Sequence, residues 1–210
     1  MLKSIFATIL CFAIFANIAQ AAEKPRVVVM DLGARHSSEI SSENIGAMAS
    51  DYLLEALWST NRFAVMDWEN AEEEIITSKL PTSGLIPPSA AREIAKLLNA
   101  DYIIYGNISS VDSKDLVFEI AGNGGNFRSI KSALIVRMMD VKTGEILVVA
   151  KGKGASKSSE IRGGAKNLAY ITIGTKKVPS ICVHNAIKKA TFAAAEEIVA
   201  EFFNEPLKKK

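Results

Sequence analysis

The sequence predicts an α/β fold (α+β) in which helices cover a mixed sheet. In the N-terminal half, apolar runs rich in β-branched residues alternate with segments of helical spacing, in the order strand, helix, strand, helix, helix, strand. The next part holds consecutive strand-like runs joined by short turns, which is typical of an antiparallel meander with extended hairpins. A long helical pattern follows, and 210 residues are enough for one domain with a full core.

Three strands and three helices are predicted in the N-terminal half. Short apolar runs place the strands at Arg26 to Leu32, Arg62 to Asp67 and Ala100 to Ser109, and the first has the pattern of a strand buried on both faces. Apolar spacing places helices at Ile45 to Leu57 and Ser89 to Leu98, and a short acidic helix is expected between them at Glu69 to Lys79. Ser41 or Ser42 is expected to cap the first helix, and Ser89 the third.

The second half predicts hairpins and one long helix. Strand-like runs occur at Leu116 to Ala121, Ser129 to Asp140 and Glu145 to Ser156, with a turn at Val141 to Gly144. A polar, glycine-containing segment from Lys157 to Lys177 interrupts the meander. Pro179 is suited to start a helix with one apolar stripe that ends near Asn204.

The N-terminus has the pattern of a secretory signal peptide. Lys3 precedes an uncharged, largely apolar run that ends in Ala19-Gln20-Ala21, so we expect cleavage between Ala21 and Ala22 and export to the periplasm. An uncleaved membrane anchor is the alternative. The predicted organisation is therefore a signal peptide at 1–21, a linker at 22–25, a single domain at 26–204 and a basic tail at 205–210.

The cysteines and the charge balance narrow the possible partners. Cys11 follows Ile9-Leu10 within the apolar run and lacks the small residues that precede a lipidated cysteine, so no lipid anchor is expected there. Cleavage would leave Cys182 alone, without an internal disulfide. The formal charge of +2 and the absence of a long basic block argue against nucleic acid as a partner.

No pattern of catalytic residues stands out in the sequence. The glycines of Ala121 to Ser129 lie between two strand-like runs, whereas a phosphate loop needs a helix after its glycines. Cys182 and His184 are two positions apart on a predicted helix, which separates their side chains, and no residue spacing matches a zinc or calcium site. We therefore predict no enzyme, no cofactor and no metal, with Cys182 and His184 as the pair to test if an enzyme were reconsidered.

The glycine-rich stretch instead predicts a hairpin tip at Gly122, Asn123, Gly124, Gly125 and Asn126. Asn-Gly-Gly-Asn suits a tight turn that requires positive φ. Whether this tip meets water or a membrane is open at this point, and the charges of Arg128 and Lys131 close behind it favour water.

Four motifs occur in a fixed order along the chain: "RVVVMDLG" from Arg26, "NRFAVMDWEN" from Asn61, "AKLLNADYIIYGNIS" from Ala95 and "DVKTGEIL" from Asp140. Together they resemble the family of the curli secretion channel CsgG and its relatives in holdfast assembly. With the signal peptide and the long C-terminal helix, the resemblance covers most of the chain after Ala21. One departure is the missing lipidation cysteine at the processing site.

The resemblance implies a periplasmic α/β domain related to the N-terminal domain of the TolB protein. In the family's channel, two hairpins per subunit form an outer-membrane β-barrel within a ring, and they would correspond here to about 111–133 and 151–177. Phe127 and Tyr170 would then be aromatic residues at the membrane interface, with ordinary edge-strand packing as the alternative. The channel's constriction loop would correspond to Gly33 to Ser42, where Arg35 and His36 differ from its aromatic and amide set.

Three functions remain open from the sequence. The first is a non-enzymatic periplasmic or outer-membrane-associated component of curli-type assembly and secretion, acting through protein contacts that include self-association. The second is an oligomeric outer-membrane secretion channel. The third is a periplasmic regulatory module of cell-wall synthesis, because activators of penicillin-binding proteins resemble the same domain.

Overall fold

The computed structural model describes residues 23–34, 40–41, 45–66, 75, 77–79, 87–120, 123–161, 170–173 and 176–206. For 40–41, 116–120, 123–127, 158–161, 170–173 and 176–179 the description is limited to the backbone. The predicted signal peptide with Ala21 and Ala22, the loop residues Arg35 and His36, and most of the predicted helix Glu69 to Lys79 lie outside the described residues.

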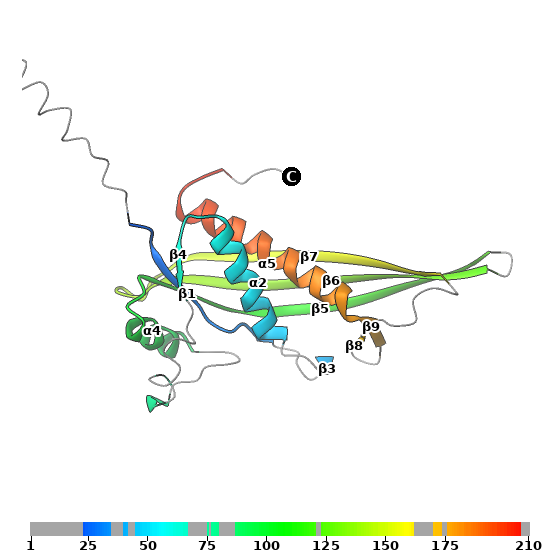
Figure 1. Ribbon diagram of the computed structural model, residues 1–210, viewed down its shortest axis with the longest axis horizontal. Helices are drawn as coiled ribbons and strands as arrows, with labels where there is room; N and C mark the ends of the chain where they lie inside the picture. Colours follow the sequence, from blue (N-terminus) through cyan, green and yellow to red (C-terminus); the bar gives the residue numbers. More distant parts are fainter. Residues whose placement is uncertain are drawn as a thin grey trace, which may run out of the picture.

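The main sheet is mixed, as predicted, and three helices pack against it (Figure 1). Its strand order is β4 (Ala64–Met66), β1 (Arg26–Val29), β5 (Tyr102–Ile120), β6 (Asn123–Asp140) and β7 (Ile146–Ile161), and β2 (Gly33–Ala34) also pairs with β5. A second sheet contains β3 (Ile40–Ser41), β8 (Tyr170–Ile173) and β9 (Lys176–Pro179). The described helices are α2 (Ile45–Ser59), α4 (Pro88–Leu97) and α5 (Ser180–Phe202).

Strand direction divides the main sheet into two parts. β1 pairs in parallel with both β4 and β5, whereas β5, β6 and β7 form an antiparallel meander. Parallel strands require helical crossovers, and antiparallel strands need only short turns. The predicted α/β first half, the meander with an extended hairpin and the long last helix are therefore confirmed.

The helices cover both faces of the sheet but in different places. α2 and α5 lie on one face, where they share a core with Ile104 of β5, Leu134 of β6 and Val148 of β7. α4 lies on the other face and packs in a smaller core with Ile103 and Met139. β1 contributes Val27 to the first core and Val28 to the second, which confirms that this strand is buried on both faces.

One predicted helix cap is wrong, and one of the two candidates for another is excluded. The N-cap of α4 is Pro87, without a side-chain cap, and Ser89 lies inside the helix, because Pro88 supplies the preset φ that favours the first helical position. Ser41 belongs to β3, several residues before α2 begins at Ile45. Residue 42, the other cap candidate, lies outside the described residues.

The first hairpin is longer than predicted, and its turn lies earlier. β5 does not end at Ser109 but continues to Ile120, because a register shift between Ile108 and Ser110 lets the polar stretch remain paired with β6. Asn123, Gly124, Gly125 and Asn126 do not form a turn: they belong to β6 and pair with Ile120, Glu119, Phe118 and Val117. Gly122 lies outside the described residues.

The second predicted hairpin differs more strongly. β7 continues to Ile161 beside β6 instead of ending near Ser156. The described part of the expected return, β8, pairs with β9 and β3 in the second sheet. The strand partners of β8 are thus set by contacts remote in sequence, which local turn signals do not encode.

α5, the longest described helix, makes a close contact with β7, the edge strand of the main sheet. A Cβ atom at Gly152 would overlap the carbonyl oxygen of Ala190, and one at Gly154 would overlap that of Ala186. Gly152 would also place its Cβ 3.1 Å from the Cβ of Ala194. Glycines on the strand and alanines on the helix therefore allow the two backbones to touch.

Tyr105 is buried on the α4 face with a hydroxyl that has no hydrogen-bond partner among the described residues. Its side chain is 5% exposed. Burial raises the pKa of Tyr105, an effect that the nearby Arg137 guanidinium reduces. The missing partner indicates that the neutral hydroxyl is held at a cost, because burying an unpaired polar group is unfavourable.

We predict that Gly154→Ala destabilises the protein by about 3 kcal/mol, since the added methyl meets helix backbone that cannot rotate away. Lys153→Ala is the matched control: its side chain is exposed between the two glycines, and a change within about 0.5 kcal/mol is expected. Urea unfolding measures both values. Equal stability of the two variants would contradict the close contact.

We further predict that Tyr105→Phe raises the free energy of unfolding by about 1 kcal/mol at neutral pH, because it removes the unpaired hydroxyl. Burial raises the pKa of Tyr105 in the folded protein above the unfolded value of about 10. The unmodified protein therefore keeps its full stability below about pH 10 and loses stability as the pH rises from there through the folded-state pKa, because the unfolded chain ionises first. The advantage of the variant should therefore grow above about pH 10. Thermal unfolding from pH 7 upward checks both expectations, and a less stable variant would refute them.

Candidate functional site

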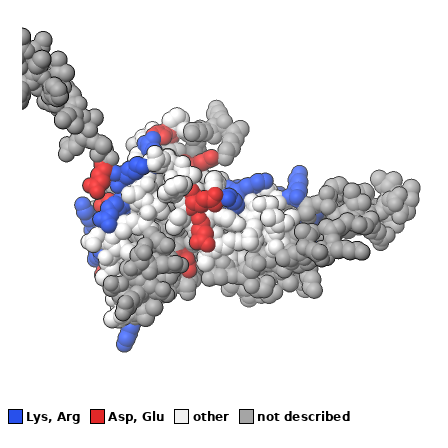
Figure 2. All heavy atoms as spheres, in the orientation of Figure 1, with Lys and Arg blue, Asp and Glu red and all other residues white. Residues whose placement is uncertain are grey.

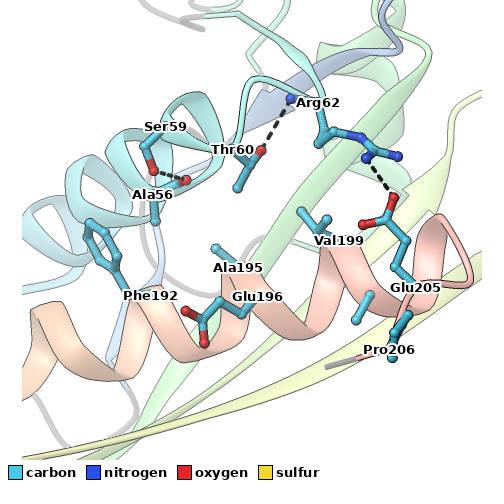
Figure 3. A pocket seen from close by; sticks show the side chains of 11 residues that line it. Ala56, Ser59, Thr60, Arg62, Phe192, Ala195, Glu196, Val199, Glu205 and Pro206 are labelled. Carbon is cyan, nitrogen blue, oxygen red and sulfur yellow. Dashed lines mark hydrogen bonds and ion pairs between the residues drawn. The ribbon is translucent and has the colours of Figure 1, made fainter. Parts of the chain in front are cut away.

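A groove of about 360 Å³ lies between the C-terminal ends of α2 and α5 (Figure 3). Its residues come from the end of α2, the turn after it, the last turns of α5 and the segment after α5: Ala56, Ser59, Thr60, Arg62, Phe192, Ala195, Glu196, Val199, Ala200, Glu205 and Pro206. Small alanines on both helices leave the space, and charged side chains lie around it.

The hydroxyl groups of the groove are engaged in ending α2. Ser59 Oγ donates to the Ala56 carbonyl at 2.7 Å, and Thr60 Oγ1 donates to the Leu57 carbonyl at 2.6 Å. Asn61 then adopts a φ of 58°, in the left-handed region where asparagine is tolerated. These hydroxyls satisfy helix-end carbonyls, so they are held by the backbone instead of being activated by a neighbouring base.

An ion pair closes one end of the groove. Arg62 Nη1 lies 2.6 Å from Glu205 Oε1, and the two side chains are 40% and 42% exposed (Figure 3). The Arg62 guanidinium also lies over the Phe203 ring, 4.2 Å from its centroid. Phe203 packs in turn against Phe63 and Phe202, with ring centroids 5.3 and 4.8 Å away. The end of α5 is thus anchored mainly by aromatic packing beneath a solvent-exposed pair.

A wider hollow of about 600 Å³ continues along α5 and shares Phe192 and Glu196 with the groove. Its remaining residues are Lys153, Asn185, Lys188, Lys189 and Ala193. Lys188 Nζ contacts both carboxylate oxygens of Glu55, at 2.9 and 2.8 Å, and lies 5.2 Å from the Tyr52 ring centroid. Figure 2 shows the result on this side of the molecule, where acidic and basic groups are interspersed.

Cys182 and His184, the pair considered for nucleophilic chemistry, make different contacts. Cys182 is 4% exposed within the core between the helices and the sheet. His184 lies with Nδ1 at 3.4 Å from the Tyr52 hydroxyl, in a hydrogen bond whose direction depends on the tautomer. The thiol is thus buried, and the histidine is hydrogen-bonded to a tyrosine of α2. The helix spacing predicts this separation of the two side chains.

The residues proposed for a membrane interface are not brought together by strand pairing. Phe127 belongs to β6 and pairs with Leu116 of β5, whereas Tyr170 belongs to β8 and pairs with Pro179 of β9. These strands belong to different sheets. An interfacial role for Phe127 and Tyr170 stays a prediction.

In the described part of the chain, no three histidine, cysteine, aspartate or glutamate side chains are grouped so that they could hold a metal ion. Among the described residues, no helix combines the length and apolar character needed to span a membrane.

The groove could not have been identified from the sequence. Its residues come from two helices and the segments after them, and they are mostly alanines, hydroxyl residues and one ion pair. The local signal is the recurrence of alanine in the apolar stripe of each helix, which predicts close helix packing and not an opening. What the groove offers is a partly apolar surface with charged edges, which suits the binding of a protein segment.

Comparison with protein families gives a match over nearly the whole sequence. The model of the curli production assembly/transport component CsgG matches residues 13–210. The chain belongs to the CsgG family. The resemblance inferred from the sequence motifs is thereby confirmed. The matched region includes both the α/β half and the hairpin half of the chain.

Similar folds occur among solved structures, at low sequence identity. The C-terminal domain of LpoB from Salmonella enterica is 19% identical, with 67% of this chain and 90% of that chain covered and a TM-score of 0.45. The PelC dodecamer from Paraburkholderia phytofirmans is 15% identical, with 84% of this chain and 91% of that chain covered and a TM-score of 0.39. Comparison with curated proteins finds no match.

We predict that Arg62→Ala lowers the free energy of unfolding by about 1 kcal/mol, mainly through lost packing of the guanidinium on Phe203. Glu205→Gln is the matched control, because it removes only the exposed charge pair, worth a few tenths of a kcal/mol. Chemical denaturation of both variants distinguishes the two contributions. A larger loss in Glu205→Gln would show that the ion pair dominates.

Proposed function

We propose that this chain is a non-enzymatic component of CsgG-type protein assembly and secretion in the periplasm, associated with the outer membrane and acting through protein contacts. The observation that carries the proposal is the match of the CsgG family model to residues 13–210. The signal-peptide pattern supports export.

The groove between α2 and α5 supports binding as the mode of action. Its hydroxyls are engaged by helix-end carbonyls, and its walls combine small apolar residues with charged edges. Such a surface can receive a side chain or a helix end from a partner, and the alanines allow close approach. We assign the partner contact to this groove.

An oligomeric secretion channel is the second candidate, and the long hairpin supports it. β5 has 19 residues and β6 has 18, more than the about 10 residues that a strand needs to cross a bilayer. However, the hairpin beyond Val111 carries charge on both faces, with Asp112, Lys114 and Lys131 on one and the Asp115–Arg128 ion pair on the other. Charged side chains on a lipid-facing surface are costly, so the non-inserting function is preferred.

In-cell photo-crosslinking tests the proposed contact. A photoreactive phenylalanine derivative at Ser59, inside the groove, should capture a specific envelope protein of a secretion or assembly system. The matched control is the same substitution at Thr143, an exposed hydroxyl residue in the turn between β6 and β7. Mass spectrometry identifies the product. Capture of a cell-wall synthase at Ser59 would favour the regulatory module, and equal products at both positions would contradict a groove contact.

Planar bilayers separate the two secretion functions. Protein purified from the envelope of an exporting host is added to a bilayer, and unitary currents are recorded. The proposed component should give none. Steady unitary conductance, together with a ring-sized mass in solution, would replace the proposal with the channel.

A further inference from the structure

The face of the β5–β7 meander opposite α5 is rich in lysine. Five exposed lysines occur there, and we call them the lysine face: Lys114 on β5, Lys131 on β6, and Lys151, Lys153 and Lys157 on β7. They are spread over three neighbouring strands and lie beyond the area where α4 contacts β5 and the β6–β7 turn.

Strand register places these five residues on one face. Directly paired residues of neighbouring strands share a face, and Lys157 pairs with Ser129, which pairs with Lys114. Two residues earlier on β7, Ala155 pairs with Lys131, which pairs with Asp112. Lys153 and Lys151 follow on β7 at alternate positions.

The glycines of β7 show which face this is. At Gly152 and Gly154 an added Cβ would meet the backbone of α5, so these two positions point toward the helix. Because successive strand residues point to opposite faces, Lys151 and Lys153 belong to the face away from α5, and Lys153, on the edge strand, also borders the hollow along α5. The burial pattern agrees, since Gly152 and Ser156 are buried while the three lysines of β7 are exposed.

The charge on this face is not balanced. Asp112 opposite Lys131 is the one carboxylate in these rows, so five lysines and one aspartate give a net charge of +4 among the described rows 112–114, 129–131 and 151–157. The opposite side differs, because Lys188 is paired there with Glu55 and Lys189 Nζ donates to the Ala155 carbonyl. For a sequence with a formal charge of +2, the lysine face is a local concentration of positive charge.

We propose that the lysine face docks on a membrane surface that carries anionic lipid headgroups. The lysines lie on three neighbouring strands of one sheet face, and ammonium groups on long, flexible stems can reach several phosphates from it. Each lysine near an anionic leaflet contributes about a fivefold gain in affinity. This proposal rests on the proposed function, which places the protein at the cell envelope.

Exposed aliphatic residues adjoin the lysines. Ile146, Leu147 and Val149, at the start of β7, are 48%, 45% and 43% exposed. Val149 lies two residues before Lys151 on the same side of the strand, where it pairs with Arg137. Aliphatic groups beside cations suit the boundary between headgroups and acyl chains. An acidic polypeptide fits less well, because the two hollows described above lie along α5, and of the five lysines only Lys153 lines either of them.

Vesicle sedimentation tests the proposal with the protein as processed by an exporting host. The vesicles contain phosphatidylcholine alone or a mixture with phosphatidylglycerol. The test variant changes Lys151, Lys153 and Lys157 to Gln. The matched control changes Lys24, Lys96 and Lys188 to Gln, which removes the same charge from exposed lysines elsewhere. All proteins share one N-terminus, so differences between them report the lysines.

The unmodified protein and the control should bind the anionic vesicles, and the test variant should bind on the order of 100-fold more weakly. Binding should also weaken in 0.5 M salt, because the Debye length falls to about 4 Å. Equal binding by both variants, or equal binding to neutral vesicles, would overturn the proposal. Failure to bind lipid together with binding to polyglutamate would also overturn it and assign the face to an acidic protein. Crosslinking from Ser59 is a separate readout, so its failure leaves this result interpretable.

Discussion

The contact of α5 with the glycines of β7 is the constraint on which the rest of the structure depends. Gly152 and Gly154 let the backbone of α5 lie directly on the strand, with Ala186, Ala190 and Ala194 at the contact. This close approach fixes the height of α5 above the sheet. It also decides where α2 can pack, because α2 fills the remaining space on the same face and shares the larger core.

The same contact protects the last strand of the main sheet. With α5 held against β7, Glu197 accepts a hydrogen bond from the Lys151 amide at 2.8 Å, and Lys189 donates one to the Ala155 carbonyl at 3.0 Å. An edge strand with open amides and carbonyls invites pairing with other chains. Side chains from the helix occupy two of these groups, so the edge is partly closed within the chain itself. The lysine side chains of the strand then lie on the other face.

The two faces of the meander are consequently suited to different partners. The helix face carries a groove between α2 and α5, with small residues and a mixed set of charges. The sheet face carries lysines with one opposing carboxylate in their rows. A protein bound through the first and a membrane surface through the second could be engaged together, since α5 and the sheet separate them. This arrangement fits a member of the CsgG family that acts by contacts at the envelope.

The sequence by itself determined the fold class, most elements and the family. β-Branched runs marked β1 and the start of β5, and helical spacing marked α2, α4 and α5, because these signals are local and have strong periodicity. Motifs from Arg26 to Asp140 and beyond were sufficient to indicate the CsgG family. What local pattern reading missed was the continuation of β5 through polar residues to Ile120, since its pairing with β6 satisfies a backbone that the side chains alone would leave in a loop.

Only the tertiary structure decided the candidate binding surfaces. The partners of β8, the groove beside Ala195 and the role of Gly152 all depend on segments far apart in the chain. The sequence shows that Lys151, Lys153 and Lys157 share a face of one strand. It does not show that Lys114 and Lys131 join them, because cross-strand register is set by long-range hydrogen bonding and core packing, which no local pattern specifies.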